Sequence, residues 1–387
     1  MAGYLIVLMV AGSTTFALTP LVRRLALRVG AVVAPDERRV HQSPTPTLGG
    51  LAMYGGLIAA IVTATFIPQF DSVLNGTSEA WGVVLGATVM ILVGVIDDLR
   101  EVSAPAKVAG QVLAGSVMSI LGVTMLYFRL PFLDVFSLSA DLAPLVTVIW
   151  VVVMANAINL IDGLDGLAAG IVAIAAGAFA IYSDRLFDLG LLGDSISPLI
   201  AVVTLGLCLG FLPSNAHPAR IFMGDGGALL LGLLMACSTL LVAGQTVDTY
   251  SGQTFFFYAP LFIPFVILGV PVLDTIFAVL RRAGKRSGLA TADKDHLHHR
   301  LMGLGHGQRR AVFILWAWTA ILAGVVLYPA YTEQGNAMVP AGVAALAVTL
   351  YTVLHPQVRR NRAEMQGQLE LDLQESEKVS DDGGGSG

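Results

Sequence analysis

The sequence predicts an all-α integral membrane protein, and three observations support this fold class. The 387 residues are 55% hydrophobic and 13% charged, whereas roughly 25% of the residues of a soluble domain are charged. The apolar residues come in runs of about 17 to 25, the length that a helix needs to cross a hydrocarbon core of about 30 Å. Basic residues collect in every second loop between these runs.

The positions of the runs predict about eleven transmembrane helices. We expect the first to be a retained span, because no basic segment precedes it and no small-residue cleavage site follows it. Alternating segments of about ten residues, typical of outer-membrane barrels, do not occur. The predicted spans are residues 4–22, 47–68, 81–96, 106–125, 142–161, 166–183, 195–212, 226–244, 255–280, 311–330 and 337–354.

The basic residues predict the orientation of these spans. Of the 22 Lys and Arg residues, only Arg129 and Arg185 lie in loops on one side of the predicted membrane. Cytoplasmic loops of membrane proteins carry the excess of basic residues. We therefore expect the N-terminus outside and the C-terminus inside the cell.

Composition divides the chain into two regions. Residues 1–357 are predicted to form one polytopic membrane domain, and residues 358–387 an acidic, disordered cytoplasmic tail. Cys208 and Cys237 both fall inside predicted spans, where we expect them to pack as small apolar side chains. Neither a disulfide nor a thiolate metal site is indicated.

Acidic side chains interrupt the apolar runs only toward their predicted cytoplasmic ends. The segment "NAINLIDGLDG", for example, ends one run with two carboxamides and two carboxylates and has no basic residue nearby. A single carboxylate at a helix end is commonly just solvated, but a group of them beside an apolar phase is costly unless cations offset their charge. The carboxylates concerned are Asp97, Asp98, Asp162, Asp165, Asp225 and Asp274.

These residues have the chemistry of a metal and phosphate site. Asn159, Asp162 and Asp165 are spaced three apart, so neighbours share a helix face unless the intervening glycines end the helix. Oxygen ligands of this kind suit Mg²⁺ or Mn²⁺, and not zinc. The glycines of "MGDGG" leave backbone N–H groups free at a helix start, where phosphate is favoured. We therefore predict an active site at the cytoplasmic face.

The longest cytoplasmic loop, "RRAGKRSGLATADKDHLHHRLMGLGHGQRR", supplies positive charge and histidines. Its basic residues could be ordinary positive-inside anchors. A zinc site would need three or four converging N or S ligands, and no cysteine lies nearby in the sequence. Phosphate recognition by His298, His299 and Arg300 is the interpretation that we prefer. Lys107 follows Asp98 closely and is predicted to lie beside the carboxylate pair.

Four segments, "GVIDDL", "NAINLIDGLDGLAAG", "FMGDGGALLLG" and "DKDHLHHRLMGLG", resemble the polyprenyl-phosphate N-acetylhexosamine-1-phosphate transferases of the MraY-like superfamily. These are integral membrane enzymes that move a sugar 1-phosphate from a UDP-sugar to a lipid phosphate. The segment "DERRVHQSPTPTLGG" also looks like the entry of that family into its second span. The H-x-H-H form of the last motif is similar to the UDP-GlcNAc-using WecA and TagO branch.

The resemblance implies a role for each motif residue. The residues implied in catalysis are Asp97, Asp98, Lys107, Asp162 and Asp165. The residues implied in substrate binding are His41, Asn156, Asn159, His296, His298, His299 and Arg300. Asp225 is implied as the main ligand of Mg²⁺, with Asn159 as a second ligand and Mn²⁺ as an alternative metal.

The implied reaction uses UDP-GlcNAc and decaprenyl or undecaprenyl phosphate, and releases UMP. The resemblance places the enzyme in the bacterial inner membrane and allows a homodimer; no nucleic acid is expected as a partner. Direct attack by the lipid phosphate is favoured over a covalent phosphoryl-aspartate intermediate. UDP-GalNAc, UDP-QuiNAc or UDP-MurNAc-pentapeptide remain alternative donors.

Two other classes of function are less favoured. A secondary transporter usually binds its ions near the bilayer midplane and often has inverted repeats, whereas these charges lie at one surface and no repeat is visible. A non-enzymatic lipid-binding protein would account for the basic loops but not for the carboxylates.

Overall fold

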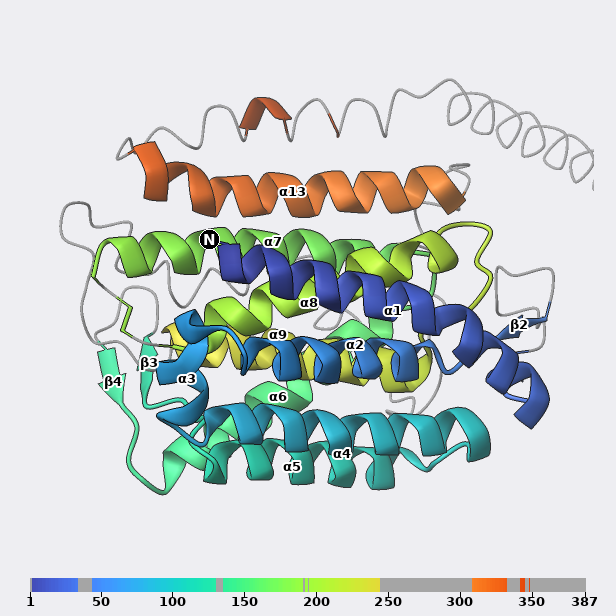
Figure 1. The fold of residues 1–387 in the computed structure, drawn as a ribbon, viewed down its shortest axis with the longest axis horizontal. Coiled ribbons are helices and arrows are strands. Elements are labelled where there is room, and N and C mark those ends of the chain that lie inside the picture. The colour runs from blue at the N-terminus through green and yellow to red at the C-terminus, as the bar shows by residue number, and fades with distance from the viewer. Residues whose placement is uncertain are drawn as a thin grey trace, which may run out of the picture.

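The structure is a computed structural model that describes residues 2–33, 44–129, 135–190, 192–193, 195–243, 308–332, 342–344 and 348. Its long helices lie side by side with roughly parallel axes (Figure 1). The helices are α1 (Ala2–Val29), α2 (Gly49–Ala64), α3 (Asp71–Asn75), α4 (Glu79–Arg100), α5 (Ala104–Ile120), α6 (Leu142–Ile161), α7 (Leu167–Asp188), α8 (Ser197–Asn215), α9 (Gly224–Ala243) and α13 (Gln308–Thr332).

Six of these helices, α1, α4, α6, α7, α8 and α9, are long and apolar enough to cross a membrane. A seventh span arises if α2 is counted with the short helices after it, from which it is bent by 97°. The protein is therefore a multi-pass membrane protein, as its composition predicts. The number of eleven spans and their orientation stay predictions, because the span predicted at 255–280 and most of 337–354 lie outside the described residues, as does the predicted tail, residues 358–387.

Two details differ from the prediction of an entirely helical chain. The predicted span 47–68 ends as a helix at Ala64, and a 3₁₀ turn, Pro68–Phe70, then redirects the chain into α3. Two short antiparallel hairpins also occur, β1 (Val32–Val33) with β2 (Thr45–Pro46) and β3 (Tyr127–Arg129) with β4 (Val135–Ser137). The hairpins lie at opposite ends of the bundle (Figure 1). Strands of two or three residues are too short to give a readable alternating pattern.

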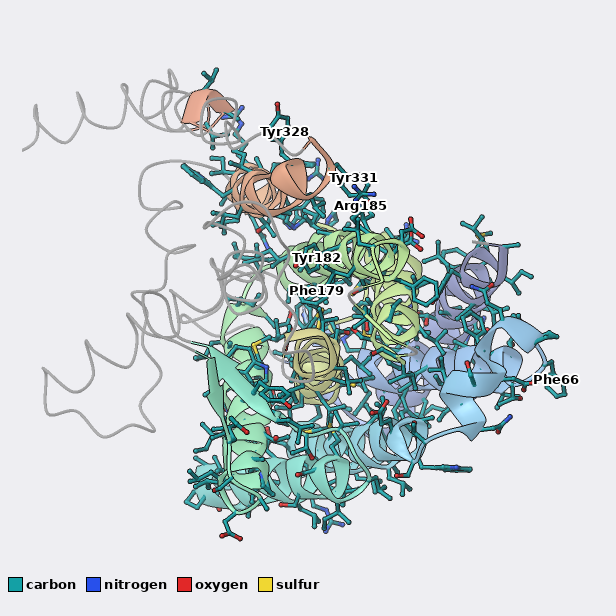
Figure 2. The ribbon with its side chains drawn as sticks, turned by 90° about the vertical axis from the view of Figure 1, so that its left-hand side faces the viewer. Phe66, Phe179, Tyr182, Arg185, Tyr328 and Tyr331 are labelled. Carbon is teal, nitrogen blue, oxygen red and sulfur yellow. The ribbon has the colours of Figure 1, made fainter. Side chains whose placement is uncertain are left out.

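Helix α9 is the centre of the bundle. In its most apolar stretch 94% of the residues are buried, against 22% for α1. It packs against α2, α4, α6 and α8, and the view along the helices in Figure 2 shows it enclosed by them. Small residues permit this close packing, because a Cβ at Gly50 or Gly94 would overlap the backbone of α9 at Gly226 and Gly227.

Helix α13 covers one side of α7. The indole of Trp316 lies against Gly170 and donates a hydrogen bond to the carbonyl oxygen of Leu167 at 3.4 Å. Farther along α7 and α13, the Arg185 guanidinium lies 5.4 Å from the centre of the Tyr331 ring. Figure 2 shows these two side chains next to each other. Such a cation–π contact ties α13 to the bundle at the far end of α7.

We predict that Gly94→Ala destabilises the protein. The added Cβ would overlap the Cα of Gly226, so α4 and α9 would have to separate, which typically costs about 1–3 kcal/mol. The midpoint of thermal unfolding in detergent measures this effect. Gly177→Ala in α7 is the matched control, because its Cβ would lie 3.7 Å from the Leu205 side chain, an ordinary contact. Equal midpoints for the two variants would contradict the prediction.

Candidate active site

Four helix ends meet at the end of the bundle that carries the β1–β2 hairpin (Figure 1). Asp97 and Asp98 lie in the last turn of α4, and Lys107 lies in the first turn of α5. Asp162 follows the last residue of α6, and Asp225 is the second residue of α9. The predicted carboxylates and the predicted lysine are thus brought to one end of the fold.

Lys107 joins two of the carboxylates. Its Nζ forms an ion pair with Asp97 Oδ2 at 2.6 Å and a second ion pair with Asp225 Oδ2. The other oxygen of Asp97 accepts a hydrogen bond from the N–H of Val102 at 2.7 Å, which fixes the Asp97 side chain. All three charged groups are half-buried, so their mutual attraction is screened less than at an open surface.

Asp98 caps the N-terminus of α9. Its Oδ1 accepts the N–H of Asp225 at 3.0 Å and its Oδ2 accepts the N–H of Gly226 at 3.5 Å. A carboxylate at this position satisfies backbone donors that have no partner within the helix and interacts favourably with the helix dipole. Gly224 has φ +70°, and a Cβ there would overlap the Asp98 carboxylate. The positive φ and the closeness of Asp98 explain why the first position of "GDGG" is occupied by glycine.

The start of α2 and the residues just before it hold the loop that leads into α9. The N–H groups of Gly49 and Gly50 donate to the carbonyl oxygens of Phe222 and Met223 at 3.0 and 2.8 Å. The hydroxyl of Thr47 donates to Asp98 Oδ1 at 3.4 Å. The "TPTLGG" segment therefore supports both the Asp98 cap and the backbone next to Asp225.

The turn after α6 is fastened to the same loop. Asp165 is 4% exposed, and its Oδ2 lies 2.7 Å from His217 Nδ1 and accepts the N–H of Ala219 at 3.1 Å. Asn215 accepts the N–H of Gly166 at 3.1 Å through Oδ1 and donates to the carbonyl oxygen of Ile221, also at 3.1 Å. Asp165 is thus directed toward His217, and it stabilises the turn that presents Asp162.

The pKa of Asp162 is raised from 3.8 to about 8. Burial is the main cause, and the negative charges of Asp225, Asp98 and Asp165 raise it further. When these carboxylates are ionised, the single positive charge of Lys107 does not balance them. A bound cation would relieve this repulsion.

The donor atoms fit a Mg²⁺ ion that is completed by water and substrate. Within the described residues, no group of three or more His, Cys, Asp and Glu side chains is arranged to hold a metal. Mg²⁺ does not require such a group, because it commonly binds through one or two carboxylates together with waters and substrate phosphates. Asp225, with the nearby Asp97 and with Asn159 in the last turn of α6, offers the hard oxygen ligands that this ion prefers.

Comparison with known proteins gives the family. Residues 80–243 match the family model of glycosyl transferase family 4. The chain is 37% identical over 354 residues to the decaprenyl-phosphate N-acetylglucosaminephosphotransferase of Mycolicibacterium smegmatis, covering 89% of this chain and 86% of that one. The chain belongs to glycosyl transferase family 4. The resemblance that the sequence motifs indicate is thereby confirmed.

Other members of glycosyl transferase family 4 are also similar. The probable undecaprenyl-phosphate N-acetylglucosaminyl 1-phosphate transferase of Bacillus subtilis is 36% identical over 305 residues, 78% of each chain. The phospho-N-acetylmuramoyl-pentapeptide-transferase of Moorella thermoacetica is 32% identical over 320 residues, 78% of this chain and 90% of that one.

The structure brings only some of the predicted site residues of this family 4 member together. Asp97, Lys107 and Asp225 are in direct contact, and Asp98 joins them through the backbone of α9. Asn156 lies one turn deeper than Asn159 and bonds to Gln111 of α5. The roles of all these residues stay predictions. The residues that lie outside the described part of the chain are His41, Asp274, His296, His298, His299 and Arg300.

Four residues around the site were not predicted: Thr47, Gln111, Asn215 and His217. All four are uncharged or weakly basic, and apart from the amides and histidines of the quoted motifs the sequence argument selected charged residues. The sequence could have indicated Gln111, because an amide inside a predicted span is costly unless it has a hydrogen-bond partner. The partners of Asn215 and His217 depend on how two loops meet, which spacing along the chain does not reveal.

We predict that Asp98→Ala is less stable than Asp98→Asn. The asparagine keeps an oxygen that can accept the N–H of Asp225, whereas the alanine leaves the α9 terminus uncapped, which typically costs about 0.5–2 kcal/mol. Thermal unfolding of both variants in detergent measures the difference. If the alanine variant were as stable as the asparagine variant, the capping role of Asp98 would be wrong.

We predict a pH-dependent stabilisation by Asp162→Asn in metal-free buffer. The folded-state pKa of about 8 lies above the unfolded value near 3.8, so the parent loses stability as the pH rises between these values. An asparagine side chain does not ionise, so the variant does not lose stability in this way. Its thermal midpoint relative to that of the parent should therefore rise from pH 5 to pH 9. A difference that stays constant over this range would contradict the raised pKa.

Proposed function

We propose that this enzyme transfers GlcNAc 1-phosphate from UDP-GlcNAc to a polyprenyl phosphate, releasing UMP, at the cytoplasmic face of a bacterial inner membrane. The observation that carries the proposal is the Lys107 bridge between Asp97 and Asp225 at one end of a membrane bundle. Relatives that are 37% and 36% identical carry the names of a decaprenyl-phosphate and an undecaprenyl-phosphate transferase of this kind, respectively. The position of the bridge at helix ends suits a lipid whose phosphate lies at the membrane surface.

The proposed reaction is a direct displacement. An oxygen of the lipid phosphate attacks the sugar-linked phosphorus of UDP-GlcNAc, a new P–O bond forms, and UMP leaves with the electrons of the broken P–O bond. Phosphate monoesters have a second pKa of about 6, so the attacking oxygen is already ionised at neutral pH. No covalent phosphoryl-aspartate is required.

The residues of the chain would position and neutralise the reacting phosphates. Asp225 and Asn159 would hold Mg²⁺, which when bound polarises phosphoryl oxygens and offsets charge on the leaving group. With Asp225 engaged in this way, the Lys107 ammonium is free to donate to phosphoryl oxygens while Asp97 keeps it in place. Asp98 would hold the start of α9, and therefore Asp225, in position.

UDP-MurNAc-pentapeptide is the second candidate donor. The similarity to phospho-N-acetylmuramoyl-pentapeptide-transferases, 32% identity over 320 residues, favours it specifically. The higher identity to the N-acetylglucosamine enzymes, and the H-x-H-H form of the histidine motif, favour UDP-GlcNAc.

UMP release by the purified protein tests the proposal. With UDP-GlcNAc, decaprenyl phosphate and Mg²⁺ we expect UMP and a lipid-linked GlcNAc diphosphate, and EDTA should abolish both. Asp225→Asn should lower the rate by about 10²-fold or more, because it weakens a charge that acts on the reacting phosphates. Asp71→Asn, an exposed carboxylate of α3, is the matched control and should leave the rate unchanged.

The outcomes separate the parts of the proposal. Turnover with UDP-MurNAc-pentapeptide in place of UDP-GlcNAc would keep the reaction and replace the donor. Full activity in EDTA would remove the metal from the proposal. Folded protein without turnover on any donor would refute the reaction itself.

A further inference from the structure

Two amides face each other between α5 and α6, inside otherwise apolar helices. Gln111 is 0% exposed, and its Oε1 accepts a hydrogen bond from Asn156 Nδ2 at 2.6 Å. The same Nδ2 donates to the carbonyl oxygen of Val152 at 2.7 Å, which fixes the Asn156 rotamer. Gln111 is shielded from water inside the bundle, where a hydrogen bond is stronger than at an open surface.

This pair lies one helical turn below the candidate site, on the two helices that carry Lys107 and Asn159. Gln111 follows Lys107 by four residues and therefore shares its face of α5. Asn156 precedes Asn159 by three residues and shares its face of α6. One turn deeper again, a Cβ at Gly115 would lie only 3.2 Å from the Val148 backbone, so the two helices approach closely there.

Stability alone does not account for this pair. The Nε2 of Gln111 has no acceptor among the residues that the structure describes. A buried donor without a partner costs roughly 1–3 kcal/mol, whereas replacing both partners by apolar side chains of similar shape can be neutral or stabilising. Two leucines would therefore hold α5 and α6 together at least as well, but without fixing their rotation and register.

We propose that Gln111 is a positioning residue for the reaction, acting through Asn156. The amide pair sets the register of α5 against α6, and it thereby places Lys107 relative to Asn159 and Asp162. Asn156 acts in this arrangement by holding α6. The inference rests on the proposed function, because it concerns the geometry in which Lys107 meets the reacting phosphates.

The double variant Gln111→Leu/Asn156→Leu tests this role. We expect a thermal midpoint at or above that of the parent, a kcat lowered by about 10- to 100-fold, and a KM for UDP-GlcNAc close to that of the parent. A purely structural role predicts instead that stability and kcat fall together. The exchanged pair Gln111→Asn/Asn156→Gln keeps the same groups and the same combined length, so it should restore kcat toward the parent value.

Ser116→Ala is the control on α5, because the Ser116 hydroxyl donates to the carbonyl oxygen of Val112 within its own helix at 2.8 Å. Its kcat should equal that of the parent. An unimpaired kcat in the dileucine variant, or no recovery in the exchanged pair, would overturn the inference while the parent still turns over. Lack of turnover in the parent itself would refute the proposed function and the inference with it.

Discussion

The contact between the Asp98 carboxylate and the first N–H groups of α9 is the constraint on which the rest of the site depends. Asp225 is the second residue of that helix, so whatever fixes its N-terminus fixes Asp225. Asp98 lies in the last turn of α4 beside Asp97, whose carboxylate forms an ion pair with Lys107. The Asp98 cap therefore fixes α4 relative to α9. Through the ion pairs of Lys107 with Asp97 and Asp225, α5 is held in the same arrangement.

This cap requires α4 and α9 to touch backbone to backbone. Gly94 of α4 meets Gly226 without room for a Cβ, and Gly224 leaves space for the Asp98 side chain itself. The near-complete burial of α9 follows, because α2, α4, α6 and α8 can all approach a helix of small and apolar residues. The packing of the membrane bundle and the geometry of its charged end thus have the same cause.

The sequence predicted the elements of this arrangement better than their contacts. Runs of apolar residues predict helices such as α6 and α9 closely, since a span must be long and uncharged. The gathering of Asp97, Lys107 and Asp225 followed from their common position at predicted cytoplasmic ends. The capping role of Asp98 and the Asp165 contact with His217 did not, because each depends on which loop lies opposite. The hairpins escaped prediction because their strands are so short.

The contacts also explain how the fold tolerates so many carboxylates beside an apolar phase. Asp98 and Asp165 accept hydrogen bonds from backbone N–H groups, which offset part of the cost of burying these side chains. Asp97 and Asp225 are offset by Lys107, which both share. The pKa of Asp162 is raised by burial and by the negative charges of Asp225, Asp98 and Asp165. The cluster thus combines carboxylates that have defined partners, such as Asp97 and Asp98, with Asp162, whose ionised form is disfavoured by burial and by its acidic neighbours.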